Sequence, residues 1–252
     1  MKHPFDLSGK TALVTGANTG LGQGMAVALA KAGADIVLVG RSAPTETLAA
    51  IKAAGQKAYD IRADLIETAA AKTALAEAVE IAGQVDVLVN NAGIIRRNDA
   101  VDFSEDDWDA VMDVNLKNLF FLSQAFANHC IGRKAPGKIV NIASMLSFQG
   151  GIRVASYTAS KSGVMGLTRL MANEWAHHGI NANAIAPGYF ATNNTAALQA
   201  DEDRNAAILG RIPAGHWGKP EELGGAVVFL ASAASNYVHG ITLPVDGGWL
   251  AR

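Results

Sequence analysis

Tyr157 and Lys161 are the residues of this chain whose types and spacing most directly suggest chemistry. On a helix, residues four apart share one face, with β-carbons about 5–6 Å apart. A tyrosine ionises near pH ~10, so a tyrosine base working near neutrality needs its pKa lowered by about three units, or ~4 kcal/mol. One cation at ~4 Å, in an effective dielectric near 20, supplies about that much. The pair predicts an acid–base tyrosine in a closed pocket, although many such pairs are only structural.

The composition favours one large α/β domain. The chain has 252 residues, half of them hydrophobic and 6% aromatic, which suits helices packed closely on a buried parallel sheet. We interpret residues 1–252 as a single domain, without linker or repeat. A net charge of −2 argues against nucleic acid or anionic membranes as partners. No stretch reaches the ~18 apolar residues of a membrane span, and the first residues lack a signal sequence, so we expect a cytoplasmic protein.

Cysteine and histidine give no sign of a metal site. Cys130 is the only cysteine, so no internal disulfide is possible, and its apolar surroundings favour a buried structural residue. The six histidines are scattered without the spacing of metal ligands. We therefore expect no metal.

Strand and helix patterns alternate along the whole chain. We expect strands near residues 11–15, 36–39, 58–61, 85–89, 138–143, 183–186 and 241–245. Helices are expected near 25–32, 45–54, 68–82, 156–178 and 226–233, with one or two more within 107–130. This alternation predicts right-handed βαβ units and a parallel sheet covered on both faces. The segment 192–213 has few apolar residues and few β formers, which predicts an insert near 190–215 that covers the site.

Polar and glycine clusters follow the first four strands. They are residues 16–22, 40–41, 64–65 and 90–93. Ligands of such a sheet bind beyond the carboxyl ends of its strands, where the strand order reverses. The first cluster places backbone N–H groups and a helix start together, which suits a pyrophosphate. Its glycines are not spaced as G-x-G-x-x-G, and a merely tight turn is the alternative.

Two further polar residues belong to the same argument. Ser144 follows the fifth expected strand and therefore reaches the same edge, thirteen residues before Tyr157. Asn115 lies in an otherwise apolar helical stretch, and a buried asparagine must be hydrogen-bonded. It is either a structural bracket or part of a polar relay.

Five motifs in register resemble the classical short-chain dehydrogenase/reductase family. They are Thr15-Gly16-Ala17-Asn18-Thr19-Gly20-Leu21-Gly22, Asn90-Asn91-Ala92-Gly93, Ser144, Tyr157-x-x-x-Lys161 and Pro187-Gly188. The resemblance covers essentially the whole chain. It implies a single-domain, doubly wound Rossmann fold of seven parallel strands, NAD or NADP as cofactor, and a homotetramer.

The same resemblance implies roles for individual residues. Ser144 steadies the substrate oxygen, Tyr157 exchanges the proton, Lys161 holds the nicotinamide ribose and lowers the tyrosine pKa, and Asn115 occupies the fourth catalytic position of a proton relay. The residues expected to bind the cofactor are Gly16, Asn18, Thr19, Gly20, Leu21, Gly22, Arg41, Asp64, Leu65, Asn91, Ala92, Gly93, Tyr157, Lys161, Pro187, Gly188, Phe190 and Thr192.

The choice between NAD and NADP is finely balanced. A carboxylate at the end of the second strand would bind the ribose 2′-hydroxyl, but Gly40 stands there, next to Arg41, which can pair with a 2′-phosphate. Against this, Thr19 stands where phosphate-binding relatives often carry a base, and the chain is similar to members that use NAD. We place NAD narrowly ahead, with NADP possible.

The substrate is expected to be a small sugar acid. Three arginines near the catalytic edge, Arg96, Arg97 and Arg153, suit a carboxylate, with surface ion pairing as the alternative. Gln149 could bind sugar hydroxyls. We expect substrate contacts from Arg96, Arg97, Ser144, Met145, Gln149, Arg153 and Tyr157.

The segments around the site favour one substrate class within the family. They resemble members that oxidise a secondary hydroxyl of a six-carbon keto-deoxy sugar acid, or reduce its diketo partner, in uronate breakdown. A reductase of another polyol or keto acid, such as gluconate, is the first alternative. A dinucleotide sensor without turnover is the second, against which the intact Ser144, Tyr157 and Lys161 argue.

Overall fold

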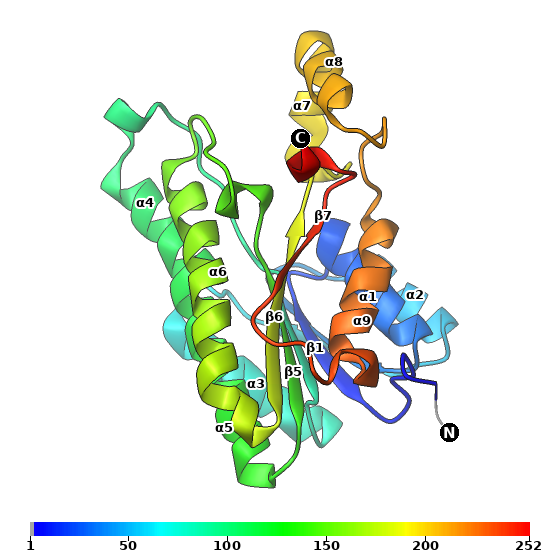
Figure 1. Cartoon of the computed structure of the whole chain (residues 1–252). Coiled ribbons are helices and arrows are strands. Elements are labelled where there is room, and N and C mark those ends of the chain that lie inside the picture. The colour runs from blue at the N-terminus through cyan, green and yellow to red at the C-terminus, as the bar shows by residue number, and fades with distance from the viewer. Residues whose placement is uncertain (1–2) are drawn as a thin grey trace.

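A seven-stranded parallel sheet forms the centre of the molecule (Figure 1). The structure is a computed structural model that describes residues 3–252, apart from the side chain of Thr68. The strand order is β3-β2-β1-β4-β5-β6-β7. The strands are β1 (Thr11–Thr15), β2 (Asp35–Gly40), β3 (Ala58–Arg62), β4 (Val87–Asn90), β5 (Gly137–Ile142), β6 (Ile180–Pro187) and β7 (Thr242–Val245). The order reverses between β1 and β4, which marks the ligand-binding edge of such a sheet.

Helices cover both faces of the sheet. One layer holds α1 (Gly20–Lys31), α2 (Thr45–Ala53) and α9 (Gly224–Ala231), and the other holds α3 (Thr68–Ala82), α4 (Glu105–Met112), α5 (Asn118–Arg133) and α6 (Ala155–Trp175) (Figure 1). Adjacent strand residues point to opposite faces, so Leu13 joins the core under α3 and α5, whereas Ala12 and Val14 join the core under α1. None of the helices in the described part of the chain combines the length and the apolar character that a membrane span requires.

The fold class predicted from the sequence is confirmed, and two elements begin three or more residues earlier than predicted. Helix α1 begins at Gly20 instead of near residue 25, because its glycines are required by close contacts and do not end the helix. Strand β6 begins at Ile180 instead of near residue 183. The side chains of Asn181 and Asn183 both donate to the carbonyl of Val238, which satisfies polar groups in the first half of this strand.

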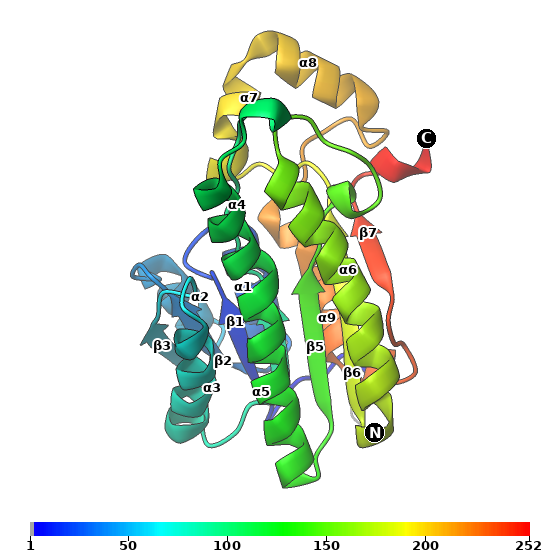
Figure 2. The ribbon, with the colours of Figure 1, turned by 90° about the vertical axis from the view of Figure 1, so that its left-hand side faces the viewer.

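The segment between β6 and α9 stands over the carboxyl ends of the strands (Figure 2). It contains α7 (Ala196–Ala200) and α8 (Glu202–Arg211). The side chain of Asp201 accepts a hydrogen bond from the backbone N–H of Arg204 at 3.0 Å and so caps α8. The predicted insert is therefore helical and lies at the edge where the site was expected.

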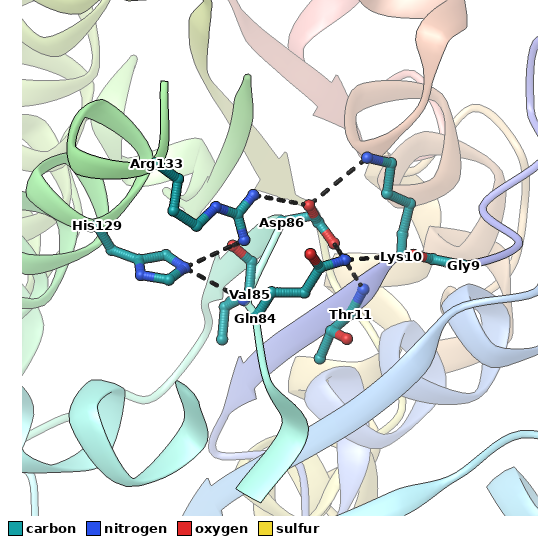
Figure 3. Close-up of polar contacts among 8 residues, drawn as sticks. All are labelled: Gly9, Lys10, Thr11, Gln84, Val85, Asp86, His129 and Arg133. Carbon is teal, nitrogen blue, oxygen red and sulfur yellow. Dashed lines mark hydrogen bonds and ion pairs between the residues drawn. The ribbon is translucent and has the colours of Figure 1, made fainter. Parts of the chain in front are cut away.

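A buried aspartate ties the opposite edge of the sheet together (Figure 3). The Asp86 carboxylate accepts hydrogen bonds from Arg133 Nη2 and from the backbone N–H of Thr11, both at 3.1 Å. Gln84 Nε2 donates to it at 3.1 Å, and Lys10 Nζ lies 3.5 Å away. This one side chain therefore joins β1, the start of β4 and the end of α5.

We expect Asp86→Ala to lower the free energy of unfolding by about 2 kcal/mol, because it leaves the Thr11 N–H buried without this partner and removes a charged hydrogen bond from Arg133. Asp60→Ala is the matched control, since its ion pair with Arg62 is largely exposed and such pairs contribute less than about 1 kcal/mol. Urea denaturation of both variants measures the difference. Equal losses would show that the buried network does not stabilise the fold in this way.

Candidate active site

A cavity of about 520 Å³ opens at the carboxyl ends of the strands. This volume is in the range of small-molecule and cofactor sites. Nearly all of the residues predicted to bind a cofactor or catalyse line it: Gly16, Asn18, Thr19, Gly20, Leu21, Gly22, Arg41, Asp64, Leu65, Asn91, Ala92, Gly93, Ser144, Tyr157, Lys161, Pro187, Gly188, Phe190 and Thr192. Of the predicted substrate residues, Arg97 and Met145 also line it.

The glycine turn after β1 leaves no room for side chains. Gly16 and Gly20 have φ values of +63° and +60°, which side-chain-bearing residues rarely adopt. A β-carbon on Gly22 would lie 2.3 Å from the carbonyl oxygen of Gly16. The turn leads directly into α1, whose first N–H groups have no partners within the helix. The geometry is that of a cradle for an anion such as a pyrophosphate.

The turn after β4 braces this cradle. Asn91 Nδ2 donates to the carbonyl oxygens of Thr15 and Gly16 at 3.0 and 2.9 Å. The Thr15 hydroxyl oxygen accepts hydrogen bonds from the backbone N–H groups of Asn91 and Ala92 at 3.0 and 2.9 Å. The Asn91 side chain is therefore used to hold the two turns together, while the residue still lines the cavity.

Arg41 lies at the far end of the cavity, directly after β2. Its side chain is exposed, and its carbonyl oxygen accepts a hydrogen bond from Arg62 Nη1 at 3.3 Å. The neighbouring Ser42 hydroxyl accepts a hydrogen bond from Asn18 Nδ2 at 2.7 Å, which ties this end to the glycine turn. The residues at the end of β2 and directly after it, from Gly40 to Thr45, include no carboxylate.

The end of the cavity away from Arg41 contains the predicted catalytic cluster of Ser144, Tyr157 and Lys161. Lys161 Nζ donates to the carbonyl oxygen of Ile142 at 2.6 Å and lies 5.6 Å from the centre of the Tyr157 ring. The Ser144 hydroxyl lies near enough to that of Tyr157 to lower the Tyr157 pKa. Ser144 also accepts a hydrogen bond from the backbone N–H of Leu146 at 3.1 Å, which fixes its side chain. The strand β5 delivers the serine and the first turns of α6 deliver the other two.

Burial controls the charges of this cluster. It raises the pKa of Tyr157, while the hydrogen bond from Ser144 and the charge of Arg97 act in the opposite direction. Burial also lowers the pKa of Lys161 to about 8. The sequence pointed to Lys161 as the cation that acidifies the phenol; its Nζ lies 5.6 Å from the centre of the Tyr157 ring, and the charge of Arg97 also lowers the Tyr157 pKa.

Asn115 lies in a π-helical segment, Asp113–Lys117, between α4 and α5. Its Oδ1 accepts a hydrogen bond from the N–H of Ile94 at 2.8 Å, and its Nδ2 donates to the carbonyl of Ile94 at 2.9 Å and to the Ser160 hydroxyl at 3.3 Å. The residue is 1% exposed and is not among the residues that line the cavity. These contacts make Asn115 a structural bracket for the turn after β4, and its part in a polar relay stays a prediction.

Three predicted substrate residues lie outside the cavity, which corrects their expected placement. Arg96 and Arg153 form ion pairs with Asp107 and Asp99, each at 3.1 Å, on the exposed surface. Gln149 Oε1 accepts hydrogen bonds from Trp249 Nε1 at 3.2 Å and Arg211 Nη2 at 3.3 Å. The surface ion pairing considered as the alternative therefore describes two of the three arginines, and the glutamine joins the insert to the C-terminal segment.

Other residues of the lining were not predicted. From the insert and its start they include Tyr189, Asn193, Asn194, Thr195, Leu198 and Arg204, and from the segment before α6 they include Leu146, Ile152 and Val154. No motif marks these residues. Their only signal in the sequence is their position in the two segments expected to vary with substrate.

Comparison with known proteins supports one family. Residues 16–250 match the family model described as enoyl-(acyl carrier protein) reductase. The chain is 62% identical over 248 residues to 2-dehydro-3-deoxy-D-gluconate 5-dehydrogenase of Escherichia coli, with 98% of each chain covered. It is 46% identical over 252 residues to gluconate 5-dehydrogenase of Gluconobacter oxydans, again with 98% of each covered.

A solved structure agrees with these relatives. A candidate 2-deoxy-D-gluconate 3-dehydrogenase from Agrobacterium tumefaciens with bound NADP is 62% identical, has a TM-score of 0.95 and covers 100% of both chains. A Rossmann sheet with a glycine cradle and a Ser, Tyr and Lys cluster at one edge defines a class of dinucleotide-dependent oxidoreductases. The chain belongs to the short-chain dehydrogenase/reductase family.

Proposed function

We propose that this protein transfers a hydride between NAD(P) and the C5 position of 2-dehydro-3-deoxy-D-gluconate. The observation that carries the proposal is the cavity itself, which has an anion cradle on one side and the hydroxyl groups of Ser144 and Tyr157 on the other. The 62% identity to the Escherichia coli enzyme over nearly the whole chain supports this substrate.

The residues of the cavity fit a dinucleotide. The pyrophosphate would lie over the turn from Gly16 to Gly22, which is so close-packed that a β-carbon on Gly22 would collide with the Gly16 carbonyl and the Asn91 side chain. Asp64 and Leu65 would border the adenine, and Pro187, Gly188 and Thr192 the nicotinamide. When bound, the cofactor supplies or accepts the hydride, and the protein must hold the reacting carbon and move one proton.

Tyr157 is the proposed proton donor and acceptor. In oxidation its phenolate takes the proton of the substrate hydroxyl, and in reduction the neutral phenol gives it back. Ser144 donates a hydrogen bond to the same substrate oxygen, since its hydroxyl already lies beside that of Tyr157. Lys161, held by the carbonyl of Ile142, stabilises the phenolate and binds the nicotinamide ribose. Asn115 positions this machinery through Ile94.

The raised pKa of Tyr157 affects how reduction and oxidation depend on pH. Because burial raises this pKa, the phenol is mostly protonated at neutral pH in the free protein. A protonated phenol is the form that reduction requires, and a phenolate is the form that oxidation requires. Oxidation should therefore become faster as the pH rises towards the tyrosine pKa.

Gluconate is the runner-up substrate, supported by the Gluconobacter relative. A panel of 2-dehydro-3-deoxy-D-gluconate, 2-deoxy-D-gluconate and D-gluconate, each with NAD⁺ and NADP⁺, separates the candidates by kcat/KM. We expect the first compound to exceed gluconate at least tenfold. A higher kcat/KM for gluconate would favour the runner-up, and cofactor binding without turnover of any sugar acid would favour a sensor.

Arg41 is the proposed determinant of cofactor choice. The sequence placed NAD narrowly ahead, but Arg41 lines the cavity after β2 and NADP is bound in the Agrobacterium structure. We therefore expect both cofactors to be used and Arg41→Leu to lower kcat/KM for NADP⁺ at least tenfold while changing that for NAD⁺ less than threefold, because guanidinium–phosphate pairs contribute about 1.5–3 kcal/mol. Equal losses for both cofactors would contradict this role.

The assembly and compartment are also proposals. A homotetramer is supported by the family resemblance and by β7, an edge strand that leaves one side of the sheet unpaired. A cytoplasmic location is supported by Cys130, which is buried as a free thiol. Light scattering measures the mass of the assembly. We further propose one catalytic domain across residues 1–252, in which the insert near 190–215 covers the substrate.

A further inference from the structure

Arg204 is the one arginine that the insert contributes to the cavity among the described residues. We propose that Arg204 binds the C1 carboxylate of the sugar acid and so determines the preference for an acidic substrate. This inference rests on the function proposed above. It assigns to the insert a specific binding contact in addition to its expected role as a cover.

The position of Arg204 on α8 places it over the substrate half of the cavity. Ile208, one helical turn further on, shares its face and packs with Met145, the neighbour of Ser144. Arg41, in contrast, belongs to the opposite end, beside Asn18 and Ser42. We therefore assign Arg204 to the half of the cavity that contains Met145 and Ser144, and not to the half that contains the proposed 2′-phosphate site.

Helix α8 is fixed well enough to position a binding group. Trp217 Nε1 donates to Asn205 Oδ1 at 2.7 Å near the start of the helix. At its end, the Arg211 guanidinium lies 4.1 Å from the centre of the Trp249 ring. Residues on either side of Arg204 are thus anchored to other segments, so its side chain projects from a defined scaffold.

The charges of the cavity also favour an anion at this place. Among the described residues of the lining, Asp64 is the only carboxylate, and it follows β3, at the Arg41 end. No ion pair within residues 3–252 engages Arg204 or Arg97. Arg97 acts on Tyr157, where the C5 oxygen would be held. The C1 carboxylate of the substrate lies four carbon–carbon bonds from C5, so it needs a binding partner other than Arg97. Arg204 supplies this partner from helix α8.

The test compares a charged substrate with its neutral counterpart. We expect Arg204→Gln to raise KM for 2-dehydro-3-deoxy-D-gluconate about 10- to 100-fold, the size of a lost charged hydrogen bond, and to change kcat less than threefold. KM for the C1 amide of the same sugar and KM for NADP⁺ should stay within about twofold. Arg204→Lys, which keeps the charge but not the bidentate geometry, should fall between Arg204→Gln and the parent.

Arg97→Gln is the matched control, since it removes the same charge from the same cavity. It should move the pH profile of oxidation to higher pH, because Arg97 lowers the Tyr157 pKa, and should not reduce the preference for the acid over the amide. If Arg204→Gln raises KM for the C1 amide as much as KM for the acid, or raises KM for NADP⁺ instead, the proposed contact is wrong.

A binding measurement separates this inference from the proposed reaction. Calorimetry compares D-gluconate with the neutral D-glucitol, each added to protein saturated with NADPH, with which neither ligand reacts. We expect the parent to bind gluconate at least tenfold more tightly and Arg204→Gln to lose that difference. A parent that does not distinguish the two, or a variant that keeps the difference, would overturn the role of Arg204, whichever sugar acid is turned over.

Discussion

Replacing Tyr157 with phenylalanine is expected to lower kcat for sugar-acid oxidation by about 10²- to 10⁴-fold, the range of an acid–base contribution. The phenol borders the cavity beside Ser144, so phenylalanine keeps the ring and removes only the proton-transferring oxygen. The affinity for NADP⁺ should change less than about threefold, because the anion cradle is untouched. Steady-state kinetics and a fluorescence titration measure the two quantities.

The control for this variant is Tyr237→Phe, which removes the same hydroxyl from a fully exposed side chain. We expect it to keep the parent kcat. Turnover of Tyr157→Phe near the parent value would remove Tyr157 from the chemistry. A fall in kcat accompanied by an equal fall in unfolding free energy and cofactor affinity would point to a structural role instead.

Lys161→Met is expected to lower kcat at least about 10²-fold at neutral pH. Lys161 is 4% exposed, and its ammonium is bound to the Ile142 carbonyl beside the Tyr157 ring, so its loss removes a cation close to a developing phenolate. Methionine has a similar shape and keeps the packing of α6. The same kinetic assay measures the loss, and a variant that retains more than a tenth of the parent kcat would contradict the assigned role.

The stability of Lys161→Met should respond to pH with a defined sign. Burial lowers the folded pKa of Lys161 from 10.5 to about 8, so the unfolded chain binds more protons between these pH values. The parent therefore gains up to about 3 kcal/mol of stability as the pH rises through this window, and the variant does not. Below pH 8 the variant avoids the cost of burying a charged lysine, but its Ile142 carbonyl loses the hydrogen bond from Lys161. Because these two effects oppose each other, the parent and the variant should have similar unfolding free energies near pH 7. Urea denaturation at pH 7 and pH 10 measures the effect, and parallel pH dependences would contradict it.

The sequence was sufficient for the framework of the site because that framework depends on local patterns. Apolar strands ending in polar or glycine residues place Gly16, Ser144 and Asn91 at one edge whatever the details of packing. The i,i+4 spacing of Tyr157 and Lys161 similarly follows from the helix alone. These features can be predicted without knowing how segments distant in the sequence pack against one another.

The substrate contacts could not be predicted in the same way, because they depend on tertiary packing. Arg96, Arg97 and Arg153 look equivalent along the chain, but nearby aspartates engage the first and the last, and only Arg97 lines the cavity. Arg204 lies nearly fifty residues after Tyr157, in an insert without a motif, and reaches the cavity only because α8 folds back over it. The reversal of the Tyr157 pKa has the same origin, since burial is a property of the assembled pocket.

Hydride transfer from C5 is the central claim, and a labelled substrate tests it most directly. The parent protein would be incubated with NADP⁺, or with NAD⁺, and 2-dehydro-3-deoxy-D-gluconate carrying deuterium at C5, and the reduced cofactor would be analysed by mass spectrometry. We expect one deuterium on the nicotinamide ring of each cofactor molecule formed. Reduced cofactor without the label, or no reduced cofactor at all, would contradict the claim.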